Sequence, residues 1–227
     1  MLTDAPLEIF LTGGTGYVAA ALLPVLARRG HRVRALARPY SERRIPREAQ
    51  VIVGDPLLGT SYLGAVRPGD TFIHLVGTPR PAPWKGESFE RVDLGSVREA
   101  VGVARAAGVA HFVYVSVAQP APVMKRYVEA RRAAEELLAA SGLRTTVLRP
   151  WYVLGPGHRW PHLLRPLYAL AERVPAWSQS ARRLGLVRRE ELIAALVAAV
   201  EAPARFRFSV LDVAGIREAG RSFAVQC

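Results

Sequence analysis

The chain has 227 residues, 50% of them hydrophobic, and its 31 basic and 19 acidic residues give a net charge of +12 at pH 7. The hydrophobic content excludes a disordered chain, and the length is that of one α/β domain with a modest extension. Because the one cysteine is Cys227, a disulfide framework within the chain is excluded, which favours a reducing compartment.

The N-terminal segment 1–6 has no basic region before an apolar core, so it lacks the pattern of a signal peptide. The longest uncharged apolar stretches, such as 17–27 and 192–200, are too short to cross a bilayer. We therefore expect a cytoplasmic protein without a transmembrane segment.

The segment 7–38 predicts a strand, a glycine turn, a helix and a second strand, in that order. An apolar run at 7–11 indicates a short buried strand, and the turn Thr12–Ala19 follows it. Apolar residues at helical spacing continue to about Arg29, and a β-rich segment at 31–37 comes next. In this context a glycine turn predicts a dinucleotide-binding site, with a plain turn as the alternative.

Small residues in this turn have separate roles. Gly13 allows a tight turn, Gly16 lets a pyrophosphate approach the backbone, and Ala19 is small enough for the helix to pack on the strand. The free N–H groups at the start of the helix then face the phosphates. The expected cofactor contacts of this segment are Gly13, Thr15, Gly16, Tyr17 and Val18.

Arg38 follows the second strand, where an acidic residue would bind the ribose 2′-hydroxyl of NAD. A guanidinium at this position instead accommodates the 2′-phosphate of NADP, which it can hold with two parallel hydrogen bonds. Arg43 and Arg44 lie just beyond, and Glu42 is the one nearby acid. We predict NADP, with NAD as the alternative if these arginines are simply solvated.

Strand and helix patterns alternate through the next hundred residues, with a proline-rich loop at 78–83. The predicted strands are 50–53, 71–76, 110–116 and 144–149, and the predicted helices are 89–108 and 123–141. Unbroken β/α alternation with short connections predicts an α/β fold with a doubly wound parallel sheet, a Rossmann fold.

The pattern changes after Pro150. Residues 151–161 indicate a loop, 163–173 a helix, 174–187 an irregular segment, 188–201 a helix and 206–213 a last strand. We therefore predict one NAD(P)-binding domain over 1–227. It comprises a Rossmann core at 1–150 and a region at 151–227 that supplies a small C-terminal cap and a return strand. Because ligands of such sheets bind outside the carboxyl ends of the strands, the cap would form the other wall of a pocket.

Basic residues gather at 28–47, 125–132 and 182–189, and only Lys85 and Lys125 are lysines. Such clusters attract anionic ligands, including nucleotides, polyanions and acidic membranes. No zinc-finger spacing or aromatic RNA-binding pattern accompanies them. An arginine-rich surface with one phosphate site is the favoured interpretation, and specific nucleic-acid binding is the weaker alternative.

These motifs resemble those of atypical or extended short-chain dehydrogenases/reductases, near the NmrA-like proteins and the relatives of the 39-kDa subunit of NADH dehydrogenase. The resemblance covers about two thirds of the chain. It is carried by these residues: 12–19, Arg38, Gly54, Asp55, 112–116, Tyr127, Arg131, Glu135, 141–143 and 148–150.

The resemblance implies further cofactor contacts along the carboxyl edge of the sheet. Asp55, with Pro56 beside it, would contact the adenine, and Val76 and Gly77 would line the adenosine side. The loop from Pro150 to Val153 would approach the nicotinamide.

The resemblance also implies a proton donor at Tyr127, a cation one helical turn later and a serine at the end of the fifth strand. Those positions are Tyr127, Arg131 and Ser116, and the family has a lysine where this chain has Arg131. A guanidinium stays charged but is bulkier than an ammonium. The sequence therefore leaves two interpretations open: these residues form a catalytic triad, or the side chains on this helix form a partly solvated row.

Other candidate residues are the histidines and the aromatic loop after Pro150. His158 and His162 lack a third ligand, so no metal site is predicted, and His74 and His111 are expected in the core. A substrate wall or a packed hinge is expected from five residues: Trp151, Tyr152, His158, Arg159 and Trp160.

Taken together, the patterns predict an NADPH-dependent oxidoreductase acting on a small or moderately apolar carbonyl, or on a quinone. The main alternative is a non-catalytic module that binds the dinucleotide as a redox sensor or as a structural subunit for a protein partner.

Overall fold

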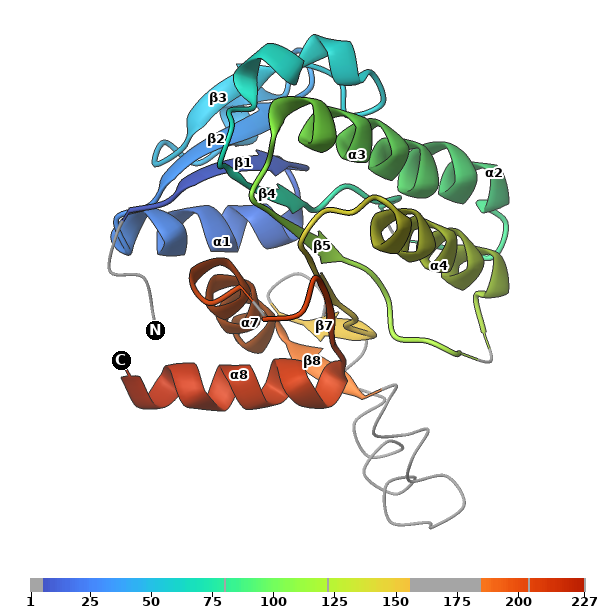
Figure 1. Cartoon of the computed structure of the whole chain (residues 1–227). Helices are drawn as coiled ribbons and strands as arrows, with labels where there is room; N and C mark the ends of the chain where they lie inside the picture. The colour runs from blue at the N-terminus through green and yellow to red at the C-terminus, as the bar shows by residue number, and fades with distance from the viewer. Residues whose placement is uncertain (1–5, 80, 122, 156–184, 204, 227) are drawn as a thin grey trace.

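The computed structural model describes residues 6–79, 81–121, 123–155, 185–203 and 205–226. Seven parallel strands form one sheet in the order β3-β2-β1-β4-β5-β6-β9 (Figure 1). Their bounds are Glu8–Thr12 (β1), Arg32–Ala37 (β2), Gln50–Val53 (β3), Thr71–His74 (β4), His111–Val115 (β5), Thr145–Leu148 (β6) and Phe208–Leu211 (β9). This order confirms the predicted doubly wound sheet, and every sheet strand lies where the sequence predicted one.

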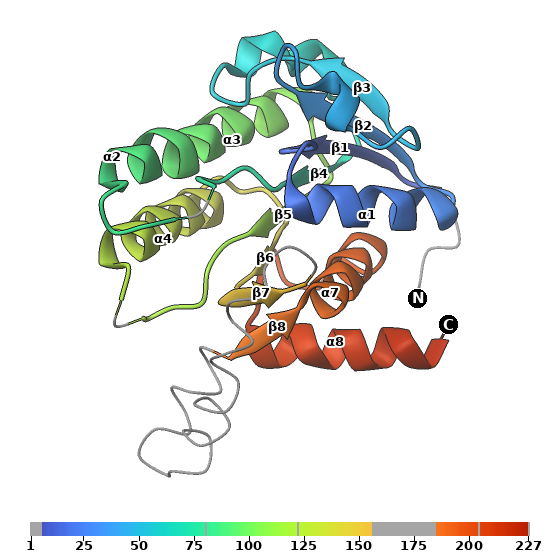
Figure 2. The same cartoon turned by 180° about the vertical axis from the view of Figure 1, so that it is seen from behind.

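Helices cover both faces of the sheet. Helices α1 and α7 lie on one face and α3 and α4 on the other, as two opposite views show (Figures 1 and 2). The helices are α1 (Tyr17–Arg28), α2 (Gly86–Ser88), α3 (Gly95–Ala107), α4 (Lys125–Ala140), α7 (Arg189–Glu201) and α8 (Val213–Gln226). Short helical turns are η1 (Glu42–Arg44), η2 (Gly59–Ser61), η3 (Leu63–Ala65) and the π-helical segment η4 (Phe89–Leu94).

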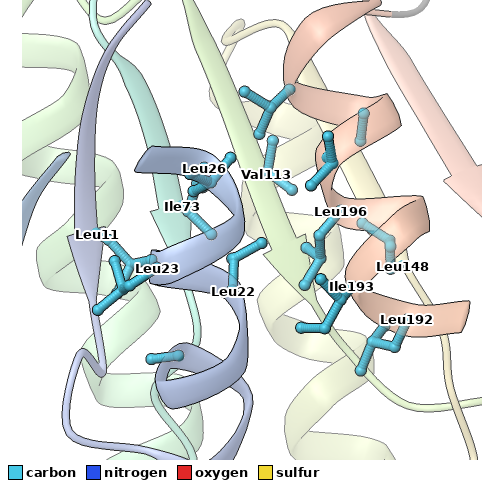
Figure 3. Close-up of a cluster of buried hydrophobic side chains, with 14 of the residues drawn as sticks. Leu11, Leu22, Leu23, Leu26, Ile73, Val113, Leu148, Leu192, Ile193 and Leu196 are labelled. Atoms are coloured by element: carbon cyan, nitrogen blue, oxygen red, sulfur yellow. The ribbon is translucent and has the colours of Figure 1, made fainter. Parts of the chain in front are cut away.

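The core on the α1 side is aliphatic. Leu22, Leu23 and Leu26 of α1 meet Leu192, Ile193 and Leu196 of α7 above Ile73, Val113 and Leu148 of the strands (Figure 3). All nine side chains are buried. Burying a side chain of this kind stabilises the fold by roughly 1.5–3 kcal/mol, so this layer fixes α1 and α7 on the sheet.

The core on the α3 side is aromatic. Phe10, Phe72 and Phe112 come from three neighbouring strands, and the rings of Phe72 and Phe112 stack with their centroids 5.0 Å apart. Tyr62 stacks on Phe10 at 5.7 Å. Because these rings lie directly below α3 and the η2–η3 turns, they hold the β3–β4 connection on the sheet.

The C-terminal region contains elements that the sequence did not predict. Tyr152–Leu154 (β7) pairs in parallel with Leu186–Arg188 (β8), where a loop and an irregular segment were expected. Helix α8 follows β9 and lies alongside α7 in both views (Figures 1 and 2). The predicted helix at 163–173 and most of the expected cap lie outside the described residues.

In the described part of the chain, no helix is both long and apolar enough to cross a membrane.

Candidate functional site

The glycine turn joins β1 to α1 at the carboxyl edge of the sheet. Gly13 has φ +78°, a conformation that favours glycine, and a Cβ atom there would lie 2.8 Å from the carbonyl carbon of Leu75. The N–H of Gly14 donates to the carbonyl oxygen of Leu36 at 3.3 Å. The turn is therefore packed tightly between the ends of β2 and β4, as its predicted role requires.

Gly16 precedes the first turn of α1. Its backbone is extended (φ −83°, ψ 167°), and no side chain of a described residue caps the helix. The positive end of the helix dipole at this turn favours an anion. Ala19 is fully buried, which lets the helix pack closely on the sheet as predicted.

Three buried polar side chains, joined by hydrogen bonds, support the glycine turn. Thr12 Oγ1 is 2.8 Å from His74 Nδ1, and His74 Nε2 is 3.1 Å from Ser96 Oγ. Burial, and secondarily the positive charge of Arg131, lower the pKa of His74 to about 3. A neutral, fully hydrogen-bonded His74 confirms the predicted core histidine.

His111 also lies in the core. It is buried and contacts Thr146 Oγ1 at 2.9 Å, and burial lowers its pKa to about 4, with Arg144 adding to the shift. His158 and His162 lie outside the described residues. Within the described ranges, no three His, Cys, Asp or Glu side chains gather as they would around a metal ion.

Arg38 follows β2 directly and is exposed, as are Arg43 and Arg44 in η1. Ile45, next to Arg44, is buried, and a Cβ atom at Gly14 would lie 2.5 Å from its Cδ1 atom. The side chain of Ile45 thus holds the arginine loop beside the glycine turn. The loop that carries Arg43 and Arg44 therefore lies next to that turn.

Asp55 lies at the carboxyl end of β3, half-buried, as the sequence placed it. Its Oδ1 accepts a hydrogen bond from the N–H of Leu57 at 2.9 Å, and its N–H donates to Ser61 Oγ at 2.9 Å. These local bonds fix the carboxylate at the sheet edge. Pro56 beside it is also half-buried.

The loop after β4 contains the predicted contacts Val76 and Gly77, both half-buried, followed by the buried Thr78. Asp93 in η4 binds this loop, because its carboxylate accepts hydrogen bonds from Thr78 Oγ1 at 2.5 Å and from the N–H of Thr78 at 3.2 Å. Asp93 is fully buried. Asp93 was not predicted as a site residue, because its sequence neighbours Glu90 and Arg91 are also charged and nothing in the pattern sets it apart from them.

Arg131 projects from α4 into the same buried region. Its Nη2 atom is 2.6 Å from Asp93 Oδ1, and Nη1 donates to the Tyr114 hydroxyl at 3.1 Å and to the carbonyl oxygen of Val115 at 2.9 Å. Arg131 also lies beside Tyr127, as the one-turn spacing predicts, because the Cζ atom of Arg131 is 5.3 Å from the centre of the Tyr127 ring. The guanidinium is nevertheless engaged by protein groups rather than free.

Tyr127 lies in the first turns of α4, half-buried, with its ring against Phe89 at a centroid distance of 5.1 Å. Burial raises the pKa of the Tyr127 phenol, and the charge of Arg131 opposes that shift without cancelling it. The phenol is therefore protonated at neutral pH, which is the form that a proton donor needs.

Ser116 is buried at the end of β5, and its hydroxyl donates to Glu135 Oε1. Glu135, the third member of the row on α4, also accepts hydrogen bonds from Gln119 at 2.7 Å and from Arg149 Nε at 3.1 Å. The predicted row of Tyr127, Arg131 and Glu135 therefore faces the sheet and is not a solvated stripe.

The loop after β6 places two more predicted residues near the edge. The carbonyl oxygen of Pro150 accepts a hydrogen bond from Ala118 at 2.9 Å, and Val153 lies in β7, paired with Val187. Tyr17 reaches this region, because a Cβ atom at Gly155 would overlap with its hydroxyl and Arg189 lies over its ring. Of the expected aromatic wall, Trp151 and Tyr152 pack edge to face, and the other three residues lie outside the described ranges.

The basic cluster at 28–47 is partly neutralised within the fold. Arg34 is buried against Asp70 at 2.7 Å, Arg32 pairs with Glu8 at 2.6 Å, and Arg29 pairs with Glu201. The cations that stay exposed without an ion-pair partner among the described residues include Arg38, Arg43 and Arg44.

We expect only weak, nonspecific binding of random duplex DNA at physiological salt, because ion pairs neutralise part of the basic cluster at 28–47. The logarithm of the binding constant should fall with the logarithm of salt concentration, with a slope of roughly −0.9 per phosphate contacted. Fluorescence anisotropy across a salt series measures this slope. Tight, sequence-selective binding at physiological salt would contradict the expectation.

The geometry can be compared with known proteins. A family model described as NAD(P)H-binding matches residues 13–159. A ceramide reductase of Caulobacter vibrioides is 32% identical over 217 residues, which are 94% of this chain and 67% of that protein. A 3-diazoavenalumate denitrifying reductase of a Streptomyces species is 30% identical, over 91% of this chain and 76% of the relative.

Solved structures share the fold. A UDP-galactose 4-epimerase matches with a TM-score of 0.68 and 19% identity over 90% of this chain and 76% of its own. A short-chain dehydrogenase/reductase superfamily protein of Agrobacterium tumefaciens, solved with bound NAD, matches with a TM-score of 0.66 and 18% identity. That match covers 93% of this chain and 81% of the other.

Proposed function

The chain belongs to the family of NAD(P)H-binding proteins, and we propose that it is a reductase that prefers NADP(H) and uses Tyr127 as proton donor. Because the chain belongs to this NAD(P)H-binding family and its relatives include reductases, it is an NAD(P)-dependent oxidoreductase.

The residues at the glycine turn fit a dinucleotide. Gly16 presents no side chain at the start of α1, and the tight packing of Gly13 fixes the turn at the end of β1. The first turn of α1 would hold the pyrophosphate, and Asp55 would face the adenine. When bound, the nicotinamide supplies a hydride to the substrate.

NADP preference rests on the arginine loop. The residue directly after β2 is Arg38 rather than an acidic residue, and it is exposed at the position where a 2′-phosphate would be bound. Replacing Arg38 with aspartate is expected to weaken NADPH binding by at least about tenfold, or roughly 1.4 kcal/mol, and to weaken NADH binding much less. Isothermal titration calorimetry with both cofactors measures the difference.

Arg28→Asp is the matched control. Arg28 is equally exposed but ends α1 at the opposite edge of the sheet, so its replacement should leave the NADPH to NADH ratio unchanged. An equal loss for both cofactors in Arg38→Asp would exclude the 2′-phosphate role.

The substrate is proposed to be a carbonyl compound with an apolar portion. The loops that leave β4 and β5 expose Trp84 (83%) and Val123 (52%), and the helices that follow these loops meet where Gly86 of α2 lies against Arg126 of α4. An apolar molecule entering beside α4 would cover these side chains. Two relatives with reductase names act on apolar compounds by those names, ceramide and a farnesyl-substituted quinoline oxide.

The observation that carries the proposed function is the position of Tyr127, protonated and beside Arg131, on the helix next to the β4 loop. The test is NADPH oxidation by the purified protein, followed at 340 nm, against long-chain ketones, short-chain ketones and quinones. We expect turnover with the long-chain ketones. Binding of NADPH without turnover on any of them would favour the redox sensor, which the engagement of Arg131 by Asp93 also permits.

A further inference from the structure

We propose that Asp93 and Arg131 form a positioning pair that holds the cofactor loop after β4, and that residue 77 is glycine because the guanidinium fills the space beside it. The inference rests on the proposed function, since it assigns these residues to the site that Val76 and Gly77 line. It gives Arg131 a role different from the free cation that the sequence predicted.

The pair joins three separate parts of the chain. Asp93 lies in η4, Arg131 in α4, and the loop at Gly77 and Thr78 follows β4. Asp93 accepts two hydrogen bonds from Thr78 and one from Arg131, so one carboxylate ties the loop to the helix. Both Asp93 and Arg131 are at least 95% buried. Helix α4 lies alongside the helical stretch formed by α2, η4 and α3 (Figures 1 and 2).

Gly77 fits only because it lacks a side chain. A Cβ atom at this position would overlap with Arg131 Nη2 and would lie 3.2 Å from Asp93 Oδ1. Gly77 has no unusual backbone angle to explain its identity, because its φ is not among the positive values. The steric requirement therefore comes from Arg131 and not from the turn.

The guanidinium cannot move aside without cost. Its Nη1 atom donates to the Tyr114 hydroxyl and to the carbonyl oxygen of Val115, while Nη2 is bound by Asp93. Rotating it away from a methyl group at residue 77 would break buried, charge-assisted hydrogen bonds. An alanine at 77 is thus expected to displace the loop instead, and with it the cofactor contacts of Val76 and Gly77.

A double-mutant cycle tests the pair. Gly77→Ala, Arg131→Lys and the double variant are compared with the wild type for NADPH affinity and, without ligand, for thermal unfolding. We expect Gly77→Ala to weaken NADPH binding at least tenfold and to lower the unfolding temperature. In the Arg131→Lys background, where the forked end of the side chain is absent, the same substitution should change affinity less than threefold.

Two control substitutions lie in helices α3 and α4. Gly102→Ala in α3 adds a methyl group with no atom within 4 Å, and Arg132→Lys removes the fork of an exposed neighbour that pairs with Glu136. Neither should change NADPH affinity. Equal effects of Gly77→Ala in both Arg131 backgrounds, on affinity and on unfolding, would overturn the positioning pair.

NADPH binding by the wild type and coupling between positions 77 and 131 together separate this inference from the proposed function. A wild-type protein that binds no dinucleotide would end the proposed function and the positioning role together. A protein that binds NADPH but shows no coupling between positions 77 and 131 would end the positioning role alone.

Discussion

Replacing Gly16 with valine is expected to remove dinucleotide binding while leaving the fold intact. The backbone at Gly16 is extended, a conformation open to any residue, and a Cβ atom there meets only the carbonyl oxygen of Gly13, at 3.1 Å. A branched side chain would instead occupy the space in which a pyrophosphate approaches the first turn of α1. We expect the dissociation constant for NADPH to rise by about 100-fold or more, equivalent to roughly 2.7 kcal/mol.

Calorimetry measures the loss, and circular dichroism during heating checks the fold. Gly13→Val gives the contrasting result, because Gly13 has φ +78° and its Cβ atom would press on the backbone of Leu75. That variant should lose stability as well as binding. Gly64→Ala, with open space around it, should change neither property. Wild-type NADPH affinity in Gly16→Val would place the phosphates elsewhere.

The sheet could be predicted because each strand is a local apolar run between turn signals. The pairs of strands in the parallel sheet then follow from the crossover helices, whose apolar faces are also local patterns. The short strands β7 and β8 could not be predicted, because each has three residues and its partner is about thirty residues away.

The glycine turn and the residues after β2 and β3 could be located from spacing alone, since the carboxyl ends of parallel strands meet at one edge. The partners of buried charges could not. Arg34 belongs to the basic cluster that the sequence predicts at the surface, but it is buried against Asp70. The spacing placed Arg131 on one face with Tyr127, yet only the fold brings Asp93 to it. Pairing between distant charges leaves no periodic signal in a sequence.

Replacing Tyr127 with phenylalanine is expected to lower the turnover number for ketone reduction by about 10²–10⁴-fold while leaving NADPH affinity nearly unchanged. This range is the usual contribution of a positioned general acid. The hydroxyl acts mainly as the substrate oxygen takes up negative charge, so its loss removes stabilisation of the transition state and spares ground-state binding. The aromatic ring stays against Phe89, so folding should be preserved. Single-turnover kinetics with NADPH and a long-chain ketone measure the effect.

The pH dependence of turnover is a second test of Tyr127 as the proton donor. Burial raises the pKa of Tyr127, so the donating form persists through neutral pH, and the rate of reduction should not fall between pH 6 and 8 through titration of this group. Phe112→Leu is a suitable control, because it alters the aromatic core on the same face of the sheet without touching Tyr127 and should lower stability rather than turnover. Turnover that survives Tyr127→Phe unchanged would assign the proton to another group. Ser116, whose hydroxyl donates to Glu135, would then be the next residue to replace.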